Sequence, residues 1–225
     1  VIDDTYDLAV DPTDFEHVLV SFHGSWGWTD SKWNASAGVA ESTDGGESWT
    51  LHAPNGFGGY GHAIHFLYSP ELGLGDKNTW LLGTQGGGMW RTSDAGETWT
   101  KVSETGIFHG GGTIYYTQAG VLYASGSPQS LRSTDNGQTW ISVGPTEGGT
   151  TCVFGDGENL WTAPALGNDT PYSTSPEDDG VAWTPYDGGA QTWHFGGPFE
   201  MAFDPQNRIL YSSNWEQGAK ALKLP

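Results

Sequence analysis

Short runs of β-branched and aromatic residues, separated by clusters of Gly, Asn and Asp, recur along the whole chain. In each cycle a first run follows a glycine cluster, and these first runs read HAIHFLY, GGTIYYTQ, TTCVFGD and FEMAFDP. A second run follows each of them, and these read NTWLLGT, GVLYASG, NLWTAPA and RILYSSN. A short third strand then leads into a repeated motif. This pattern predicts β-strands throughout and few helices.

The repeated motif reads STDGGESWT (42–50), TSDAGETWT (92–100) and STDNGQTWI (133–141). A degenerate fourth copy, EDDGVAW, ends at Trp183 and has Asp178 in the place of the motif aspartate. The three steps from Trp49 to Trp183 average about 45 residues, the length of a four-stranded propeller blade. The spacing predicts an all-β protein, a β-propeller of four-stranded antiparallel blades in a single domain over residues 1–225, with about five blades visible.

The motif S/T-x-D-x-G-x-S/T-W resembles the Asp-box, the repeat of sialidase-like β-propellers. The resemblance implies a turn between the third and fourth strands of each blade, on the face opposite the binding site. In such a turn Asp can accept backbone N–H hydrogen bonds, Gly can take the positive-φ position, and Trp can pack between blades. We therefore expect the motif aspartates to stabilise turns rather than to act in catalysis.

Charge narrows the range of partners. The chain has 27 acidic and 8 basic side chains and a net charge of −19, which repels nucleic acid phosphates and anionic membrane surfaces. Neutral ligands or cations are the expected partners. No run reaches the roughly 18 apolar residues of a membrane span, and the chain opens without Met, so we expect that a leader has been removed. The single cysteine, Cys152, lies in an apolar run and is expected to be a buried hydrophobic residue.

If the motif turns mark one face, loops entering the first strand of each blade build the other. Equivalent positions in successive blades converge on the central axis, so we expect a ring of titratable side chains at one pocket mouth. Imidazoles there can bind a metal, transfer protons near neutral pH or hydrogen-bond sugar hydroxyls, although a histidine beside glycines can also simply bind loop backbone. The predicted catalytic residues are Tyr60, His62, His109, Glu147, His194 and Asp4, with Asp3 as an alternative to Asp4.

A second kind of loop on that face links the second and third strands. The loop HGSWGWTDSKWNAS (23–36) holds three tryptophans that could stack on pyranose rings or could pack together as a small core of the loop. The predicted substrate-binding residues are His23, Trp26, Trp28, Asp30, Trp33, Gln85 and Trp215. The sequons at Asn34 and Asn168 fall in such loops and are compatible with a secreted glycoprotein.

Three groups of propeller enzymes offer comparisons. True sialidases hold the substrate carboxylate with three arginines, whereas Arg91, Arg132 and Arg208 of this chain lie in repeat strands or a turn, so a true sialidase is not expected. The opening YDLAVDPTDFEHVLVSF looks like the blade openings of xyloglucan-active hydrolases, whose inverting chemistry needs two separated carboxyls; Asp3 or Asp4 with Glu147 are the candidates. Propeller polysaccharide lyases use His and Tyr, roles that His109, His194 and Tyr60 could fill by residue type.

These features together predict a secreted carbohydrate-active propeller, either a glycoside hydrolase or a polysaccharide lyase, acting on extracellular polysaccharide or oligosaccharide. A non-catalytic, lectin-like glycan binder and a protein-interaction scaffold are the alternatives. No cofactor is required by this chemistry. The carboxylate clusters at 3–4 and 177–179 supply hard oxygen ligands, which makes Ca²⁺ or another divalent cation a candidate ligand.

The last repeat unit, FEMAFDPQNRILYSSNWEQGAKALKLP, aligns with the opening of the chain and supplies a first, second and third strand. Propellers usually close their ring by completing one blade with a strand from the other terminus, which removes exposed edges. We expect the chain to be part of a six- or seven-bladed propeller that lacks N-terminal blade material here, with a second polypeptide fragment as one way to complete it. A five-bladed ring is the alternative.

Overall fold

The computed structural model describes residues 5–22, 38–52, 57–109, 112–144, 149–164, 172–174, 177, 179–186, 198–214 and 218–225. The regular secondary structure within these ranges consists of strands only, which confirms the predicted all-β class. The described part of the chain accordingly contains no helix that is long and apolar enough to cross a membrane.

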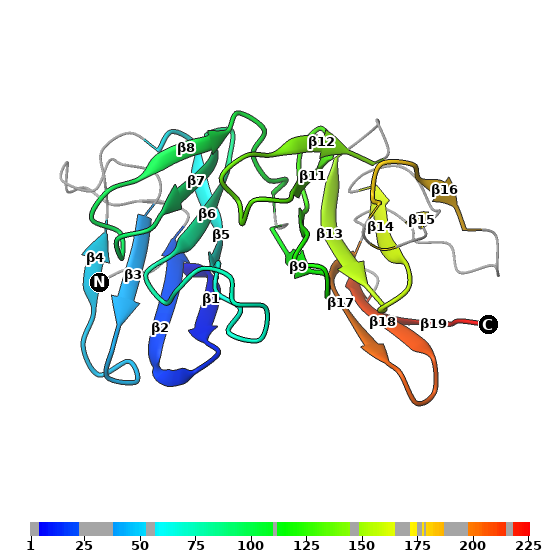
Figure 1. The fold of residues 1–225 in the computed structure, drawn as a ribbon, viewed down its shortest axis with the longest axis horizontal. Coiled ribbons are helices and arrows are strands. Elements are labelled where there is room, and N and C mark those ends of the chain that lie inside the picture. The colour runs from blue at the N-terminus through cyan, green and yellow to red at the C-terminus, as the bar shows by residue number, and fades with distance from the viewer. Residues whose placement is uncertain are drawn as a thin grey trace. The chain divides into compact units, whose positions relative to one another are not determined.

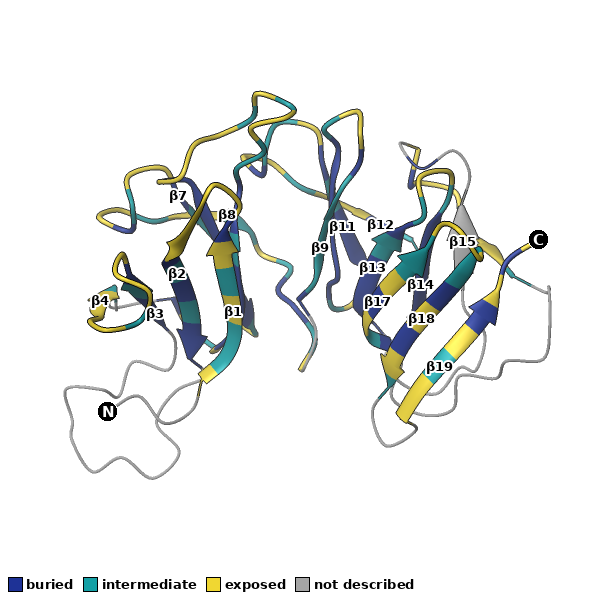
Figure 2. Ribbon diagram, turned by 90° about the horizontal axis from the view of Figure 1, so that it is seen from below, coloured by how far each residue is buried: buried dark blue, intermediate teal, exposed yellow. Residues whose placement is uncertain are grey.

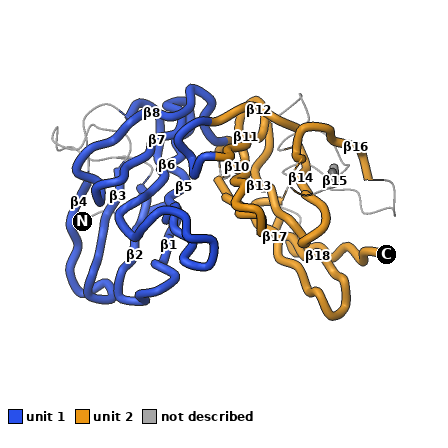
Figure 3. The backbone as a smooth tube through the Cα atoms, viewed as in Figure 1, with its two compact units in different colours: residues 1–107, 135–139 blue, residues 108–134, 140–225 orange. Residues whose placement is uncertain are grey.

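Residues 1–107 and 135–139 form the first of two compact units (Figure 3). It holds two four-stranded antiparallel sheets whose strands pair in chain order (Figure 1). The first sheet consists of β1 (Thr5–Asp11), β2 (Asp14–Phe22), β3 (Gly38–Ser42) and β4 (Thr50–His52). The second sheet consists of β5 (Tyr60–Phe66), β6 (Trp80–Gln85), β7 (Gly88–Thr92) and β8 (Thr100–Ser103).

Residues 108–134 and 140–225 form the second unit. Its third sheet consists of β9 (Ile114–Tyr116), β10 (Leu122–Ala124), β11 (Ser130–Ser133) and β12 (Ile141–Val143). The fourth sheet consists of β13 (Thr150–Gly155), β14 (Leu160–Pro164), β15 (Tyr172–Thr174) and β16 (Thr184–Pro185). The last sheet consists of β17 (Pro198–Asp204), β18 (Ile209–Asn214) and β19 (Gly218–Lys223). The four-stranded blades and the three strands of the last repeat unit are thus confirmed.

Alternation along β2 decides which of its side chains enter the core. His17, Leu19 and Ser21 are buried, whereas the intervening Val18 and Val20 are only half-buried. Because successive side chains of a strand point to opposite faces, the first three lie on one face of the sheet. That face packs against the second sheet, since Leu19 belongs to a cluster with residues of β5 and β6.

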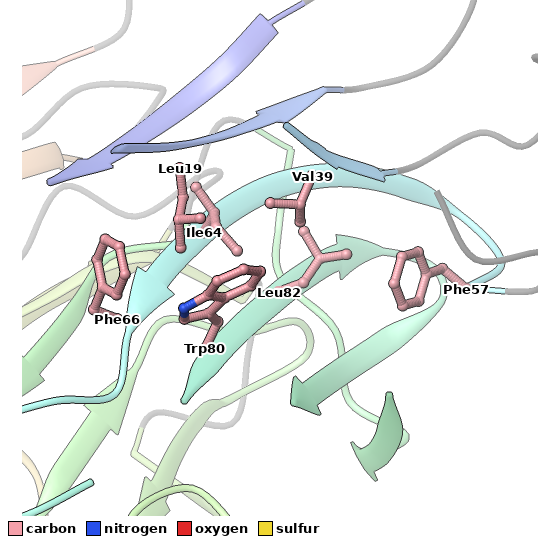
Figure 4. Packing of buried hydrophobic residues seen from close by; sticks show 7 residues of the cluster. All are labelled: Leu19, Val39, Phe57, Ile64, Phe66, Trp80 and Leu82. Carbon is pink, nitrogen blue, oxygen red and sulfur yellow. The ribbon is translucent and has the colours of Figure 1, made fainter. Parts of the chain in front are cut away.

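Large apolar side chains from the first and second sheets meet in one cluster (Figure 4). Its buried members are Leu19, Val39, Phe57, Ile64, Phe66, Trp80 and Leu82. Trp80 is fully buried, and its Nε1 donates a hydrogen bond to the Lys77 carbonyl oxygen at 2.8 Å. Because burying a Leu, Ile or Phe side chain stabilises a fold by about 1.5–3 kcal/mol, this cluster is a major source of stability for the first unit.

Two smaller clusters join successive sheets of the second unit. One joins the third and fourth sheets, and its buried members are Val121, Tyr123, Val143, Val153 and Leu160. The other joins the fourth and last sheets, and its buried members are Cys152, Trp161, Met201, Leu210, Leu222 and Leu224. The prediction that Cys152 is a buried hydrophobic residue is confirmed, and burial raises the pKa of its thiol to about 12.

The repeated motifs form turns between the third and fourth strands of their sheets, as predicted. In the second motif Asp94 accepts hydrogen bonds from the Thr98 backbone N at 2.9 Å and from the Thr98 hydroxyl at 2.6 Å. Asp44 and Asp135 accept the equivalent backbone bond, at 2.9 Å in each case. Gly96 has a φ of 81°, and a Cβ there would lie 2.7 Å from His52 Nδ1, so the turn requires glycine.

Trp49, Trp99 and Trp183 share one hydrogen bond but differ in packing. The indole N–H groups of Trp49, Trp99 and Trp183 each donate to the carbonyl oxygen of the motif glycine, at 3.0, 3.1 and 2.7 Å. Trp99 and Trp183 pack against the clusters between sheets, as predicted. Trp49 differs from these two, because its side chain is 44% exposed and no described sheet covers it.

Acid unfolding tests the motif hydrogen bonds. Bonds from Ser48 hold the pKa of Asp44 at about 2, and bonds from Thr98 lower the pKa of Asp94. An unfolded Asp has a pKa of about 4, so these carboxylates stabilise the folded chain above about pH 4 and lose that contribution as the pH falls through the folded value. We expect Asp44→Asn and Asp94→Asn to flatten the fall in Tm below about pH 4, as measured by circular dichroism.

The matched control is Glu97→Gln, which removes one negative charge from the second motif turn without touching its aspartate. This variant should keep the steep fall in Tm of the unmodified protein. If the aspartate variants and the unmodified protein lose Tm in parallel between pH 4 and pH 2, the motif carboxylates do not stabilise the fold through their ionised form.

Candidate functional site

Tyr60, predicted as a catalytic residue, and Gln85, predicted to bind substrate, lie together at one end of the second sheet. Tyr60 begins β5 and pairs with Gln85 at the end of β6. At the other end of the sheet Phe66 pairs with Trp80, and Trp80 pairs with Thr92, where the second motif begins. Tyr60 and Gln85 therefore lie at the end opposite the motif turn, as the repeat predicted.

Close packing of glycine backbones fixes this end of the sheet. Gly59 has a φ of 70°, and a Cβ there would lie 2.1 Å from the Gln85 carbonyl oxygen. A Cβ on Gly87 would lie 1.9 Å from the Gly58 carbonyl oxygen. Any side chain at these positions would push the two loops apart, so the glycines are what allow Tyr60 and Gln85 to sit on a rigid support.

The side chains at this end suit a neutral polar ligand. Tyr60 is 46% exposed, and Gln85 is half-buried. Phe57, just before Tyr60 in the chain, is buried and contacts Trp90 and Trp99 edge to face, with ring centroids 5.2 Å apart in each pair. An exposed phenol ring beside a carboxamide offers a stacking surface together with hydrogen-bond donors and acceptors.

His62, predicted as a catalytic residue, lies inside the first unit rather than at the exposed end. Its side chain is buried, and its ring centroid lies 4.1 Å from that of Tyr6 in an edge-on contact. The His62 ring therefore packs against the ring of Tyr6 on β1.

His109 is exposed and precedes β9 in the second unit. The chain that follows it is tied to the link between β10 and β11, because the Gly112 N–H donates to Ser125 Oγ at 2.7 Å. At the far end of this sheet Leu122 pairs with Ser133, where the third motif begins. The segment carrying His109 therefore enters β9 at the end opposite the motif turn, which is the arrangement seen for Tyr60 in the second sheet.

The other predicted site residues lie outside the described residues, and their roles stay predictions. They are Asp4, His23, Trp26, Trp28, Asp30, Trp33, Glu147, His194 and Trp215, together with Asp3 and the candidate glycosylation sites Asn34 and Asn168. Among the described residues, no group of three or more His, Cys, Asp or Glu side chains is arranged to hold a metal ion. Of the acidic clusters, 3–4 and Asp178 also fall outside those residues, so Ca²⁺ binding stays a prediction.

A chain of carboxylate and imidazole groups crosses the first sheet and was not predicted. His17 Nδ1 lies 3.3 Å from Asp11 Oδ2, and His17 Nε2 lies 2.9 Å from Glu41 Oε1. The second oxygen of Glu41 lies 2.9 Å from His52 Nε2. Asp11, His17, Glu41 and His52 are called the His–carboxylate network below. One signal in the sequence could have revealed part of it, since His17 alternates in phase with the apolar Leu19.

The His–carboxylate network joins the two sheets of the first unit. The rings of His17 and His52 lie 6.2 and 5.4 Å from the ring of Trp80 on β6. Burial raises the pKa of Asp11, but hydrogen bonds from Thr13 and from His17 outweigh that effect and leave the pKa below its usual value. The members of the network are thus buried or half-buried, and the network is separate from the exposed end that carries Tyr60.

A second buried acid belongs to the degenerate fourth motif. Glu177 Oε1 accepts a hydrogen bond from the Tyr115 hydroxyl at 2.7 Å and another from the Gly157 N–H at 3.0 Å. Burial and this carboxylate raise the pKa of Tyr115 above its usual value. A phenol held protonated in this way suits a structural role and is a poor nucleophile.

All three arginines are described, and each makes a structural hydrogen bond. Arg91 Nε donates to the Asn136 carbonyl oxygen, and Arg132 Nε donates to the Tyr123 hydroxyl, each at 3.2 Å. Arg208 Nε donates to the Pro225 carbonyl oxygen at 2.6 Å. Each arginine Nε is thus bound to an atom of the fold itself.

No family model matches the chain, and no curated protein matches it. Solved structures do resemble it. The GH74 xyloglucanase from Xanthomonas campestris superposes with a TM-score of 0.64 and 19% identity, over 96% of this chain and 36% of that chain. A structure of a nidogen–laminin complex gives a TM-score of 0.63 and 16% identity, over 98% and 76% of the two chains. The structure of YCF48 bound to D1 peptide gives a TM-score of 0.57 and 14% identity, over 98% of this chain and 81% of that chain.

These likenesses, together with the repeated antiparallel sheets, show that the protein has the β-propeller fold. At identities below 25% they show the fold alone. The chain spans only part of the GH74 structures that it resembles: 36% of the Xanthomonas enzyme, 38% of another from Niastella koreensis and 29% of an ancestral GH74 enzyme. The narrower resemblance to Asp-box propellers of the sialidase-like group stays a prediction.

Proposed function

We propose that this chain is part of an extracellular propeller that binds and cleaves a polysaccharide or oligosaccharide, with the sugar held at the strand ends opposite the motif turns. The observation that carries the proposal is the exposed Tyr60 beside Gln85, supported on closely packed glycine backbones. The likeness to a GH74 xyloglucanase supports it. The net charge of −19 favours a neutral ligand over an anionic one.

Hydrolysis is the favoured chemistry. Inverting cleavage of a glycosidic bond needs one protonated carboxyl and one carboxylate far enough apart to admit a water. Asp4 and Glu147 are the proposed pair. A lyase would instead remove a proton next to a uronate carboxyl and leave an unsaturated product, with His109, His194 and Tyr60 as the groups to handle that proton.

Binding and turnover are tested together with xyloglucan oligosaccharides and uronate-containing oligosaccharides. Losing an aromatic contact of about 1–1.5 kcal/mol should weaken binding about tenfold, so Tyr60→Ala should raise the Kd by that factor in titration calorimetry. Glu147→Gln should lower release of reducing ends by about 10²–10⁴-fold while binding persists. The control is Tyr211→Ala. Tyr211 is 44% exposed, close to the value for Tyr60, but it lies within β18 and not at the proposed sugar site.

The outcomes separate the candidate functions. If the unmodified protein binds a glycan without cleaving it, the protein is a lectin-like propeller. If cleavage yields an unsaturated product, the protein is a lyase and not a hydrolase. If no glycan binds, or if Tyr60→Ala and Tyr211→Ala affect the Kd equally, the proposed site is wrong.

A protein-binding propeller is the second candidate, because two of the similar structures are complexes with a protein or a peptide. They are the nidogen–laminin complex and YCF48 bound to D1 peptide. This function predicts no glycan affinity, and the same titrations therefore decide between it and the glycan proposal.

A further inference from the structure

One face of the first sheet carries large apolar side chains that are exposed or only half-buried in the described part of the chain. Leu8 pairs with Val20, Val20 with Ala40, and Ala40 with Leu51, so these four residues form one row across all four strands. Val10 and Val18 pair in the next row. We call Leu8, Val10, Val18, Val20, Trp49 and Leu51 the outer face of the first blade.

The outer face is exposed to an extent unusual for such residues. Leu8 is 58% exposed, Val10, Trp49 and Leu51 are also exposed, and the two remaining valines are half-buried. Figure 2 shows β1 as exposed or half-buried over most of its length. A sheet face that meets water normally carries polar side chains, whereas this exposed face is apolar.

The second sheet shows what covers this face elsewhere in the molecule. By strand register, Leu8 and Val20 correspond to Ile64 and Leu82, which pair in the second sheet in the same way. Ile64 and Leu82 are fully buried, and they pack in the cluster that contains Leu19 of the sheet before them. The face that is bare in the first blade is therefore covered in the second by the preceding blade.

The motif tryptophans follow the same rule. Trp99 of the second sheet packs against the cluster shared with the first sheet. Trp183 of the fourth sheet packs against the cluster shared with the third. Trp49 holds the same motif position and keeps the same indole hydrogen bond, but it is exposed.

The last sheet repeats the arrangement in the second unit. Met201 and Leu210 lie at the register positions of Leu8 and Val18, and both are buried against Trp161 of the preceding sheet. The second, fourth and last sheets thus each bury the face that corresponds to the outer face of the first blade, and in each case the sheet that precedes them in the chain covers it.

We propose that the outer face of the first blade is a docking surface for one further four-stranded blade, supplied by polypeptide other than these 225 residues. The occupant presents apolar side chains at the positions that Leu19 and Val39 hold in the first sheet. The proposal does not depend on the proposed function, since it concerns packing between blades and not the strand ends.

The last sheet of the chain, from the same or a second copy, is the competing occupant of the outer face of the first blade. The side chains on its open face suit that contact less well than those of a further blade. The covering faces seen here supply large buried side chains, such as Leu19 and Trp161. The open face of the last sheet instead carries Tyr211 between Ala202 and Ala221. Exposed charges share that face, namely Glu200 and Lys223, and these would be desolvated against leucine and valine.

Site-specific photo-crosslinking in the polypeptide as its own cells produce it tests the proposal. The probe is p-benzoylphenylalanine in place of Leu8, and the control places it at Phe15, which is exposed at the start of β2. We expect the Leu8 probe to crosslink to a blade-like segment outside residues 1–225, identified by mass spectrometry, at several times the yield of the control. Crosslinks to residues 198–225, or a yield no higher than that of the control, would overturn the proposal.

A charge substitution gives a second, independent measurement. Leu8→Asp should lower the Tm of the native polypeptide by about 5 °C or more, because it places a charge in a buried contact. The same change in the isolated 225-residue chain should shift the Tm by no more than about 1–2 °C, because the face there meets water. Equal shifts in both would contradict docking at this face.

Discussion

Replacing Trp80 by alanine is expected to destabilise the first unit by about 3–5 kcal/mol. The side chain is fully buried, and its ring lies near those of Phe66 and Trp99, at centroid distances of 6.3 and 6.4 Å. Alanine would leave a cavity among rigid aromatic neighbours, which cannot close around it, and would also orphan the Lys77 carbonyl. A domain has only about 5–15 kcal/mol of stability in total, so this change alone brings unfolding near.

Urea unfolding of the 225-residue chain, followed by circular dichroism, measures this loss. Trp49→Ala serves as the control, because Trp49 makes the same kind of indole-to-carbonyl hydrogen bond but is 44% exposed. It should cost no more than about 1.5 kcal/mol. A midpoint shift for Trp80→Ala that is no larger than the shift for Trp49→Ala would show that the cluster does not hold the two sheets together.

Replacing Glu41 by leucine should have a comparable effect, about 3–5 kcal/mol. Its two oxygens each lie 2.9 Å from an imidazole nitrogen, one in His17 and one in His52. Leucine removes both contacts at once and takes the carboxylate partner away from Nε2 of His17 and from Nε2 of His52. A buried charge or polar group without its partner costs far more than the pair contributes when intact.

Two further variants separate the charge from the loss of shape. Glu41→Gln keeps one acceptor oxygen and should cost about 1–2 kcal/mol. Glu104→Gln removes the exposed partner of Lys101 and should cost no more than about 1 kcal/mol. Urea midpoints rank the three variants, and a cost for Glu41→Leu as small as that for Glu104→Gln would contradict a structural role for the His–carboxylate network.

The strands could be predicted from local pattern, whereas the contacts between strands could not. The run HAIHFLY predicted a strand that the structure places at Tyr60–Phe66, and the motif spacing located the turns between third and fourth strands. These features depend on residues within one repeat. Glu41 and His17 are 24 residues apart, and only the register between β2 and β3 brings them together.

The candidate site shows the same division. The repeat predicted that Tyr60 and Gln85 lie opposite the motif turn, because their phase within the blade fixes the end at which they occur. The burial of His62 could not be predicted in this way, since it depends on Tyr6 of a different sheet. The exposure of Trp49 was missed for a related reason, because the motif fixes its hydrogen bond but not what packs against its ring.

The motif turns also have a consequence for the order in which the chain folds. Asp44, Asp94 and Asp135 each bond to a residue only four positions later, so these turns close with little loss of chain entropy. In the fourth copy Glu177, one residue before the motif position at Asp178, bonds to Tyr115, which is 62 residues away. We expect the first three hairpins to form early and independently, and the bond between Glu177 and Tyr115 to form only after the third and fourth sheets have met.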